Sequence, residues 1–192
     1  RLAQVEANYR KALSTPKGLL YDDDTMQLGV QHQFKGSQGR LMLFVGNKTQ
    51  SAMVNFSVKC ASTPALRMAV APVNGTVAAR AQERVQIQAE CMQPFADSPK
   101  VTVAFSHNGI AHEFDLKLPV VPTSFVEPAN MAPGDFIKHF KSMAGGGREA
   151  QGTLSAGAVG DWAAKMREVK AAFTGPLHMA VLDGVDPKPE NI

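Results

Sequence analysis

The stretch Val54-Asn55-Phe56-Ser57-Val58-Lys59-Cys60 alternates apolar and polar residues along its whole length. Successive side chains of a β-strand point to opposite faces, so this pattern predicts a strand with one buried and one solvated face. The same alternation recurs in residues 26–34, 85–91, 101–105 and 110–118. These segments favour antiparallel sheet, because strands of parallel sheets are buried on both faces and form continuous apolar runs.

A more apolar strand and several turns lie between these segments. Residues 40–45 (Arg-Leu-Met-Leu-Phe-Val) are a nearly continuous apolar run bounded by glycines, which predicts a central strand. Residues 66–70 supply another short strand, and Asn108-Gly109 is a residue pair that favours a tight type I′ hairpin. About seven short strands between residues 26 and 118 predict two antiparallel sheets packed face to face.

The pattern becomes helical after residue 118. Prolines punctuate a connector, and Pro133 is well placed at the first position of a helix. Phe136, Ile137, Phe140 and Met143 then share one face of that helix. A second helix is predicted after Asp161, and we interpret its apolar residues as core: Trp162, Met166, Val169 and Phe173. Residues 177–182 predict a strand, so this second module is expected to be of α+β type.

The amino-terminal residues 1–13 carry apolar side chains at helical spacing and predict a short helix or the end of a linker. The expected organisation is a hinge end or short helix in residues 1–18, a β-sandwich subdomain in 19–122, and part of a further subdomain in 123–192. The predicted fold class is therefore mostly β, with an antiparallel β-sandwich followed by an α+β part.

Composition narrows the class of protein. The chain has 192 residues, 44% of them hydrophobic and 19% charged, with a formal net charge of +3. This is the composition of a globular protein, and no run of like charges indicates nucleic-acid binding. No apolar run is long enough to cross a bilayer, so direct membrane insertion is not expected.

No catalytic pattern emerges from the residues that usually carry chemistry. The five histidines lack metal-ligand spacing, and Asp22-Asp23-Asp24 lacks the later glutamate of a calcium loop. Cys60 and Cys91 fall on the apolar faces of their strands, where a thiol is not activated. We therefore expect no catalytic residue, no metal and no cofactor, and a function in protein recognition.

The order of the segments resembles the appendage, or ear, of α-adaptin. The longest matching stretch is residues 39–49, Gly-Arg-Leu-Met-Leu-Phe-Val-Gly-Asn-Lys-Thr, preceded by Tyr21-Asp22-Asp23 and Met26-Gln27-Leu28-Gly29. Shorter matches follow in the same order: Asn55-Phe56, Leu66-Arg67-Met68, Ala81-Gln82, Glu90-Cys91, Lys117-Leu118-Pro119, Phe125-Val126-Glu127-Pro128, Met131-Ala132, Asp135-Phe136 and Asp186-Pro187-Lys188-Pro189.

This resemblance implies a noncatalytic module of the plasma-membrane clathrin adaptor complex, built from an immunoglobulin-like sandwich and a platform subdomain. The implied partners are endocytic accessory proteins bound through short linear motifs, the other adaptor subunits, and clathrin indirectly or weakly. The implied location is cytoplasmic, at the cytosolic face of the plasma membrane in clathrin-coated pits. Nucleic acid is not an expected partner.

The resemblance also implies two peptide sites. A platform pocket takes Asp-Pro-Phe and Phe-x-Asp-x-Phe peptides, and Phe136, Ile137 and Phe140 align with its floor. Ile137 and Phe140 stand where animal relatives carry larger aromatic residues, which predicts an altered motif preference. The basic residues of that pocket would lie beyond Ile192, so we expect an incomplete platform.

The second implied site lies at an edge of the sandwich and takes Trp-x-x-Phe peptides. Phe44 and Gln82 match its aromatic and amide positions, whereas Gln31 replaces a lysine. From the sequence alone, Phe44 is equally compatible with a buried core residue, because it falls in an apolar strand.

One alternative of a different class is an extracellular immunoglobulin-like adhesion module. It would bridge Cys60 and Cys91 by a disulfide and carry glycans on its Asn-x-Ser/Thr sequons. The single tryptophan, Trp162, lies far outside the sandwich, whereas such modules place one between the two cysteines. This absence favours the appendage interpretation.

Overall fold

A computed structural model of the chain describes residues 2–129, 131–145, 147, 150, 152–153, 155, 157, 160–182 and 184–185. Its elements in chain order are α1 (Leu2–Leu13), β1 (Lys17–Asp22), β2 (Met26–Lys35), β3 (Gln38–Asn47), β4 (Met53–Cys60), β5 (Leu66–Val70), β6 (Thr76–Val77), β7 (Gln82–Cys91), β8 (Lys100–His107), β9 (Ile110–Lys117), the 3₁₀ turn η1 (Pro122–Phe125), α2 (Pro133–Met143) and α3 (Trp162–Thr174). The chain divides into two units, Arg1–Val126 and Glu127–Ile192.

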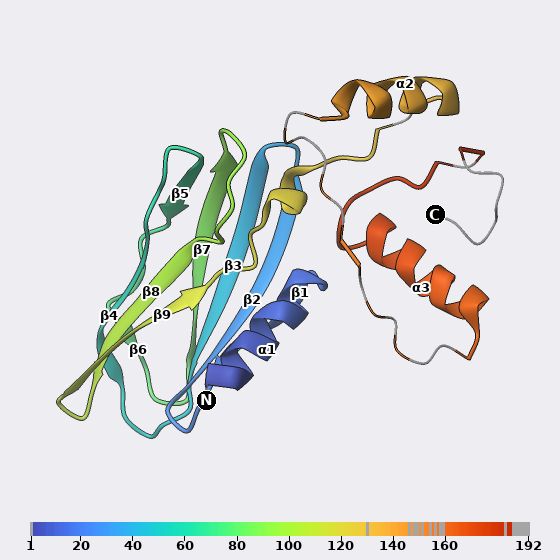
Figure 1. Cartoon of the computed structure of the whole chain (residues 1–192). Coiled ribbons are helices and arrows are strands. Elements are labelled where there is room, and N and C mark those ends of the chain that lie inside the picture. The colour runs from blue at the N-terminus through green and yellow to red at the C-terminus, as the bar shows by residue number, and fades with distance from the viewer. Residues whose placement is uncertain are drawn as a thin grey trace. The chain divides into compact units, whose positions relative to one another are not determined.

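The first unit contains two antiparallel sheets, as the alternation predicted (Figure 1). One has the strand order β1-β2-β3-β7-β5 and the other β6-β4-β8-β9. β3 is the middle strand of the larger sheet, which confirms the central position predicted for residues 40–45. Asn108 and Gly109 both have positive φ angles, 51° and 77°, and they close the β8–β9 hairpin as the Asn-Gly pair predicted.

The core lies between the inner faces of these two sheets. Leu41, Leu43 and Val45 on β3 are fully buried, and the residues between them face outward. The largest side chains with almost no exposure are Leu20, Met26, Leu28, Leu41, Leu43, Met53, Ile87 and Leu118. Period-two burial along the regular strands gives the sandwich one apolar interior and two outer faces. β4 departs from this period at its start, where an irregularity between Val54 and Ser57 leaves Val54 43% exposed and not on the predicted buried face.

Two strands were not predicted. β6 has only two residues, which is too short for an alternation to be recognised. β1 contains an irregularity between Leu19 and Tyr21, so that Leu20 and Tyr21 are both buried in succession. A bulge of this kind breaks the period of two on which the prediction depends.

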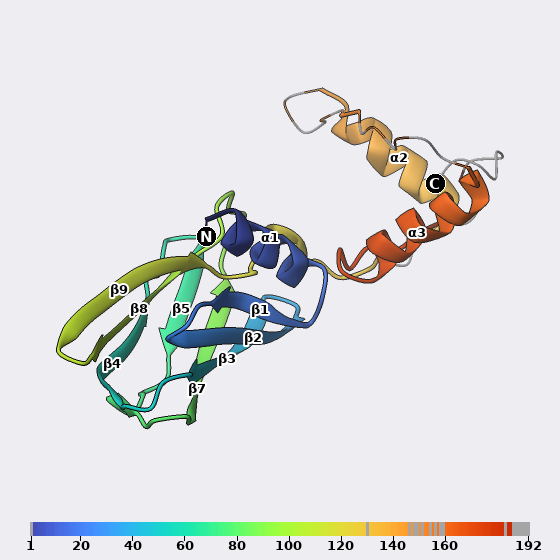
Figure 2. The same ribbon diagram turned by 90° about the horizontal axis from the view of Figure 1, so that it is seen from below.

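The residues predicted as a short helix or linker form α1, which packs on the sandwich beside β1 (Figure 2). Ala12 is fully buried, and a Cβ added at Gly18 would lie 3.2 Å from its Cβ, so a glycine permits the close approach. The Ala12 carbonyl is 3.0 Å from His32 Nε2 on β2. Tyr9 shares a hydrogen bond with Ser98 in the loop before β8, which ties α1 to the second sheet as well.

The second unit contains α2 and α3. Pro133 is the first residue of α2, and the Asp161 carboxylate accepts a hydrogen bond from Ala164 N at 3.0 Å, so both predicted helix starts are confirmed. Two predictions are wrong. Residues 177–182 form no strand, and no residue of α3 is buried; the Trp162 side chain is 63% exposed. In the described part of this unit, two helices alone offer too little apolar surface to enclose a core.

The predicted turn at Asp186-Pro187-Lys188-Pro189 lies outside the described residues.

Candidate functional site

Phe44 lies on the outer face of the larger sheet, half-buried between the side chains of its neighbours. It is opposite Gly29 on β2 and opposite Arg84 on β7. The Arg84 guanidinium carbon is 5.8 Å from the centre of the Phe44 ring, within cation–π range. Gly29 has no side chain, and the next residue across the sheet is Leu19 on β1. The structure thereby decides the question that the sequence left open: Phe44 is a surface aromatic residue and not a core residue.

Gln31 and Gln82 lie on the same outer face as Phe44. Gln31 is opposite Met42, two residues before Phe44 on β3, and Gln82 is opposite Gly46, two residues after it. Both glutamine side chains are exposed. The sheet register therefore brings the three predicted residues into one row of diagonal neighbours, at distances that long side chains can span.

The position relative to the sheet edge differs among the three residues. Gln31 and Phe44 belong to β2 and β3, which have a neighbouring strand on each side. β5 pairs with β7 only between Ile87 and Cys91, and the last bond in this direction runs from Ala71 N to Gln86 O at 2.9 Å. Within the described residues, Gln82 thus lies where β7 has a strand on one side only, and this end of β7 is the local sheet edge.

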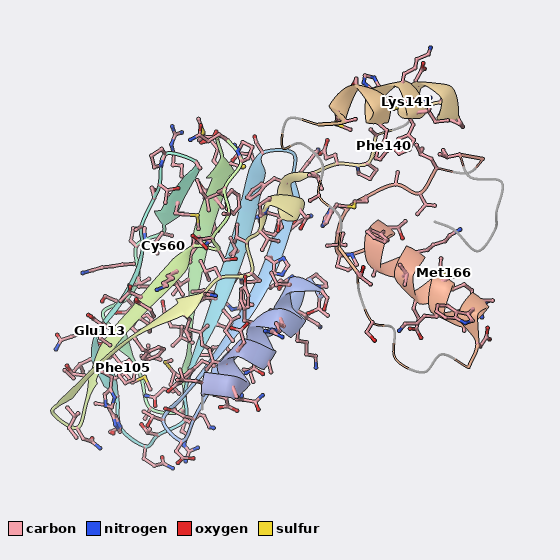
Figure 3. The ribbon with its side chains drawn as sticks, viewed as in Figure 1. Cys60, Phe105, Glu113, Phe140, Lys141 and Met166 are labelled. Carbon is pink, nitrogen blue, oxygen red and sulfur yellow. The ribbon has the colours of Figure 1, made fainter. Side chains whose placement is uncertain are left out.

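The three predicted platform residues share one face of α2 by helical spacing. Figure 3 labels one of them, Phe140, together with Lys141 on the same helix. The rings of Phe136 and Phe140 are stacked with their centres 6.1 Å apart. Phe140 is 56% exposed and Ile137 39% exposed, so this apolar stripe is accessible in the described part of the chain. Lys141 lies one turn beyond Ile137 on the helix surface. The stripe therefore offers accessible apolar surface, with Lys141 four residues after Ile137.

Sequence reasoning missed Arg84 and Lys141. Arg84 is two residues after Gln82, so the period of two already places both on one face. The alternation does not say which residue of β3 they adjoin, because lateral register depends on pairing across the sheet. Lys141 is four residues after Ile137, and helical spacing alone could have identified it.

The acidic run before β2 has a structural role. Asp23 Oδ1 accepts hydrogen bonds from Thr25 N at 2.8 Å and Met26 N at 2.7 Å, which fixes the turn between β1 and β2. A hydrogen bond from Lys48 Nζ lowers the pKa of Asp22. In the residues that the structure describes, no group of three or more His, Cys, Asp or Glu side chains could hold a metal ion.

Both cysteines are free. The Cys60 thiol donates to Lys100 O at 3.2 Å, and burial raises its pKa to about 11. The Cys91 thiol donates to Gln93 O at 3.5 Å. Cys60 is therefore protonated at neutral pH, and the disulfide required by an extracellular adhesion module is not formed. Among the helices described, none is long and apolar enough to span a membrane.

Two known protein families match this chain, each over a different part of it. Residues 16–119 match the family described as adaptin C-terminal domain, and residues 124–192 match the family described as alpha adaptin AP2, C-terminal domain. The first match alone covers more than half of the chain.

Individual relatives are similar over most of the chain. It is 29% identical over 189 residues to AP-2 complex subunit alpha-2 of Dictyostelium discoideum, which covers 98% of this chain and 19% of that protein. It is 24% identical over 175 residues to AP-2 complex subunit alpha-1 of Arabidopsis thaliana, covering 91% of this chain and 17% of the relative. The chain thus spans about a fifth of the length of these relatives.

Among solved structures, the GAE domain of GGA2p from Saccharomyces cerevisiae aligns with a TM-score of 0.47 and 15% identity. That alignment covers 55% of this chain and 97% of the GAE domain.

Proposed function

This chain belongs to the alpha-adaptin appendage family, and we propose that it recruits endocytic accessory proteins to a clathrin adaptor by binding short aromatic peptides. The appendage is a noncatalytic adaptor module. The chain spans about a fifth of the length of its AP-2 relatives, and we propose that it is part of an AP-2 type complex. We also propose that it acts in cytosolic clathrin-coated pits and contacts clathrin indirectly or weakly.

The observation that carries the proposal is the half-buried ring of Phe44 on the outer face of a rigid sheet. Aromatic side chains held by regular structure make effective peptide anchors, because little side-chain entropy is lost when they bind. Gly29 presents no side chain next to the ring, so an aromatic peptide side chain would pack there, between Phe44 and Leu19.

Polar groups around Phe44 favour an acidic peptide of Trp-x-x-Phe type. Gln31 stands where relatives carry a lysine, but Arg84 supplies a guanidinium directly beside the ring. Arg84 would pair with a carboxylate flanking the motif, while Gln82 and Gln31 donate or accept hydrogen bonds. The end of β7 at Gln82 has one neighbouring strand, so an extended peptide can also add main-chain hydrogen bonds there.

α2 is the candidate for the second motif class. Its stripe of Phe136, Ile137 and Phe140 would contact the phenylalanine of an Asp-Pro-Phe or Phe-x-Asp-x-Phe peptide. Lys141, four residues after Ile137 on the helix surface, would meet the aspartate. A helix face with one cation offers fewer contacts than the sheet face, so we expect weaker binding at α2.

The test is an amide chemical-shift titration of the 192-residue chain with two peptides, Asp-Trp-Ala-Ala-Phe-Asp and Phe-Ala-Asp-Ala-Phe. The first peptide should shift amides around Phe44 and Gln82, and the second those around Phe140. Phe44→Ala should weaken the first peptide by about tenfold or more and leave the second unchanged. Phe140→Ala should have the opposite pattern, and Arg84→Glu should weaken only the first peptide.

Matched controls are exposed apolar residues away from both surfaces. Ile110 is 63% exposed on β9, and Trp162 is 63% exposed on α3. Ile110→Ala and Trp162→Ala should bind both peptides as the parent chain does. The proposal fails for a given surface if its peptide causes no saturable shifts there while the spectrum shows a folded sandwich.

A further inference from the structure

The four-stranded sheet ends in a long edge strand, β9. The strand order β6-β4-β8-β9 gives β9 a partner on one side only. β9 pairs with β8 over eight consecutive residue pairs without any irregularity. The edge at the other end of this sheet, β6, has two residues. A long, regular edge strand presents a row of main-chain groups to which another extended chain can pair.

The register shows which residues of β9 present those groups. Ile110 pairs with His107 across a two-residue turn, and such a pair exchanges both of its hydrogen bonds. Hydrogen-bonded and non-bonded pairs alternate from there along the hairpin, and the bond from Leu118 N to Pro99 O at 2.9 Å continues that alternation. Ala111, Glu113 and Asp115 therefore direct their N–H and C=O groups away from β8, toward the open side.

A hollow of about 590 Å³ runs beside this edge. Its apolar lining comes from α1, β1, the start of β2, β8 and β9. The rings of Tyr21 and Phe114 are stacked with centres 4.8 Å apart, and those of Phe105 and His112 with centres 4.9 Å apart. Leu2 and Val5 of α1 form another part of the lining. Side chains of a strand added to β9 would enter this hollow from one face.

The Asp and Glu side chains among the residues that line the hollow give this lining a negative charge. Asp23, Glu113 and Asp115 line it, and its lining contains no lysine or arginine among the described residues. Glu113 and Asp115 are exposed and lie on the outer face of the sheet, while His112 and Phe114 face the hollow. Asp115 accepts a hydrogen bond from Thr102 Oγ1 at 2.7 Å. Lys117 lies beyond the hollow, against the ring of Tyr9.

We propose that the β9 edge binds an extended peptide segment in which basic and apolar residues alternate. Such a segment would pair with the outward main-chain groups of residues 111–115 as an additional strand. Its apolar side chains would face Tyr21 and Phe114 in the hollow, and its basic side chains would lie beside Glu113 and Asp115. Opposite charges on neighbouring strands stabilise pairing, and period-two alternation matches the two faces of the edge. This surface is distinct from Phe44 and from α2, and it takes ligands of the opposite charge.

The test uses the 192-residue chain and an acetylated, amidated peptide, Lys-Val-Lys-Phe-Lys-Val, with binding followed by amide chemical shifts and fluorescence anisotropy. Two peptides serve as comparisons: Lys-Lys-Lys-Val-Phe-Val, which has the same composition without alternation, and Glu-Val-Glu-Phe-Glu-Val. Shifts should appear on β9 and β1 for the first peptide only. The rearranged peptide should bind at least about tenfold more weakly, since its apolar side chains cannot all face the hollow.

Two variants separate charge from main-chain pairing. The double variant Glu113→Lys/Asp115→Lys should weaken the alternating peptide by about tenfold or more. Ala111→Pro removes an outward N–H without removing a bond to β8, and should weaken it by about fivefold, whereas Ala111→Val keeps the N–H and should not. Glu168→Lys on α3 changes the net charge by the same amount per site and is the control for non-specific attraction. Thermal unfolding of each variant checks that the sandwich is intact.

Three results would overturn the proposal. The first is equal binding of the alternating and the rearranged peptide. The second is undiminished binding to both the Glu113→Lys/Asp115→Lys and the Ala111→Pro variants when each is folded. The third is a dimer in analytical ultracentrifugation that Ala111→Pro abolishes, because β9 would then pair with a second copy of this chain. Retention of alternating-peptide binding by Phe44→Ala would show that the site is independent of the proposed motif sites.

Discussion

The two units of this chain differ in how they hold the residues that face solvent. In the described residues, every buried side chain lies in the unit Arg1–Val126, and none lies in Glu127–Ile192. Phe44 is held by strands paired on both sides, whereas Phe140 projects from a helix that buries nothing. Similar aromatic residues thus stand on supports that are packed to very different degrees. Mutations should therefore be costly in the first unit and nearly silent in the second.

The largest expected effect comes from removing core volume in the sandwich. Leu43 is fully buried at the centre of β3, so Leu43→Ala should lower the free energy of unfolding by about 3 kcal/mol. Met166→Ala, on the half-buried face of α3, should change it by less than about 0.5 kcal/mol. Urea unfolding followed by the β-sheet circular dichroism signal measures both. Equal losses would mean that α3 packs as tightly as β3, and the comparison would fail.

A buried polar side chain in the sandwich is expected to have the next largest effect. Asn47 is 4% exposed; its Nδ2 donates to Val77 O and Ala78 O at 3.1 Å and to Ser51 O at 2.9 Å. Asn47→Ala removes one donor from each of these carbonyls and the acceptor of the Thr49 N–H, and should cost about 2 kcal/mol in unfolding free energy.

The counterpart in the second unit is Asp161, the exposed cap of α3. Asp161→Ala should cost about 1 kcal/mol of helix stability and leave sandwich unfolding unchanged. Urea titration of the sheet signal and amide exchange in α3 separate the two effects. Asn74→Ala, at an exposed turn position, is the control for Asn47 and should be close to neutral.

The same contrast explains how far the sequence could predict the structure. The regular strands β2, β7, β8 and β9 follow from period two, because each has one face on a common core. In β4 the period holds only from Phe56 onward, because of the irregularity between Val54 and Ser57. β1 does not follow, since the irregularity beside Leu20 buries two consecutive residues. Residues 177–182 have the composition of a strand but no strand beside them to pair with in the described part of their unit. A strand-like sequence pattern therefore forms a strand only where a neighbouring strand can pair with it.

The residues of the candidate sites were likewise predictable from the sequence only in part. Phe44, Gln82 and Gln31 were identified from family resemblance, and period two could add that Arg84 shares the face of Gln82. That Arg84 lies against the Phe44 ring depends on β3–β7 register, which no single strand encodes. The apolar stripe on α2 could be identified from helical spacing alone. Its exposure could not be predicted, because an apolar stripe is usually covered by another element.

The smallest expected effect distinguishes two surface ion pairs, one in each unit. Lys48 Nζ lies 2.9 Å from Asp22 Oδ1, and its hydrogen bond lowers the pKa of Asp22 in the folded chain. A carboxyl group with a lowered folded pKa contributes stability above its unfolded pKa, near 3.8, and loses it as the pH falls through the folded value. Asp22→Asn should therefore cost about 0.3 kcal/mol at pH 7, since solvent screens this partly exposed pair, and nothing near pH 2.

Glu168→Gln, which breaks the α3 pair with Lys165, should leave sandwich unfolding unchanged at every pH. Urea titrations at pH 7, 5 and 3 measure the difference. A loss from Asp22→Asn that is constant with pH would mean that the shape of the turn matters and its charge does not.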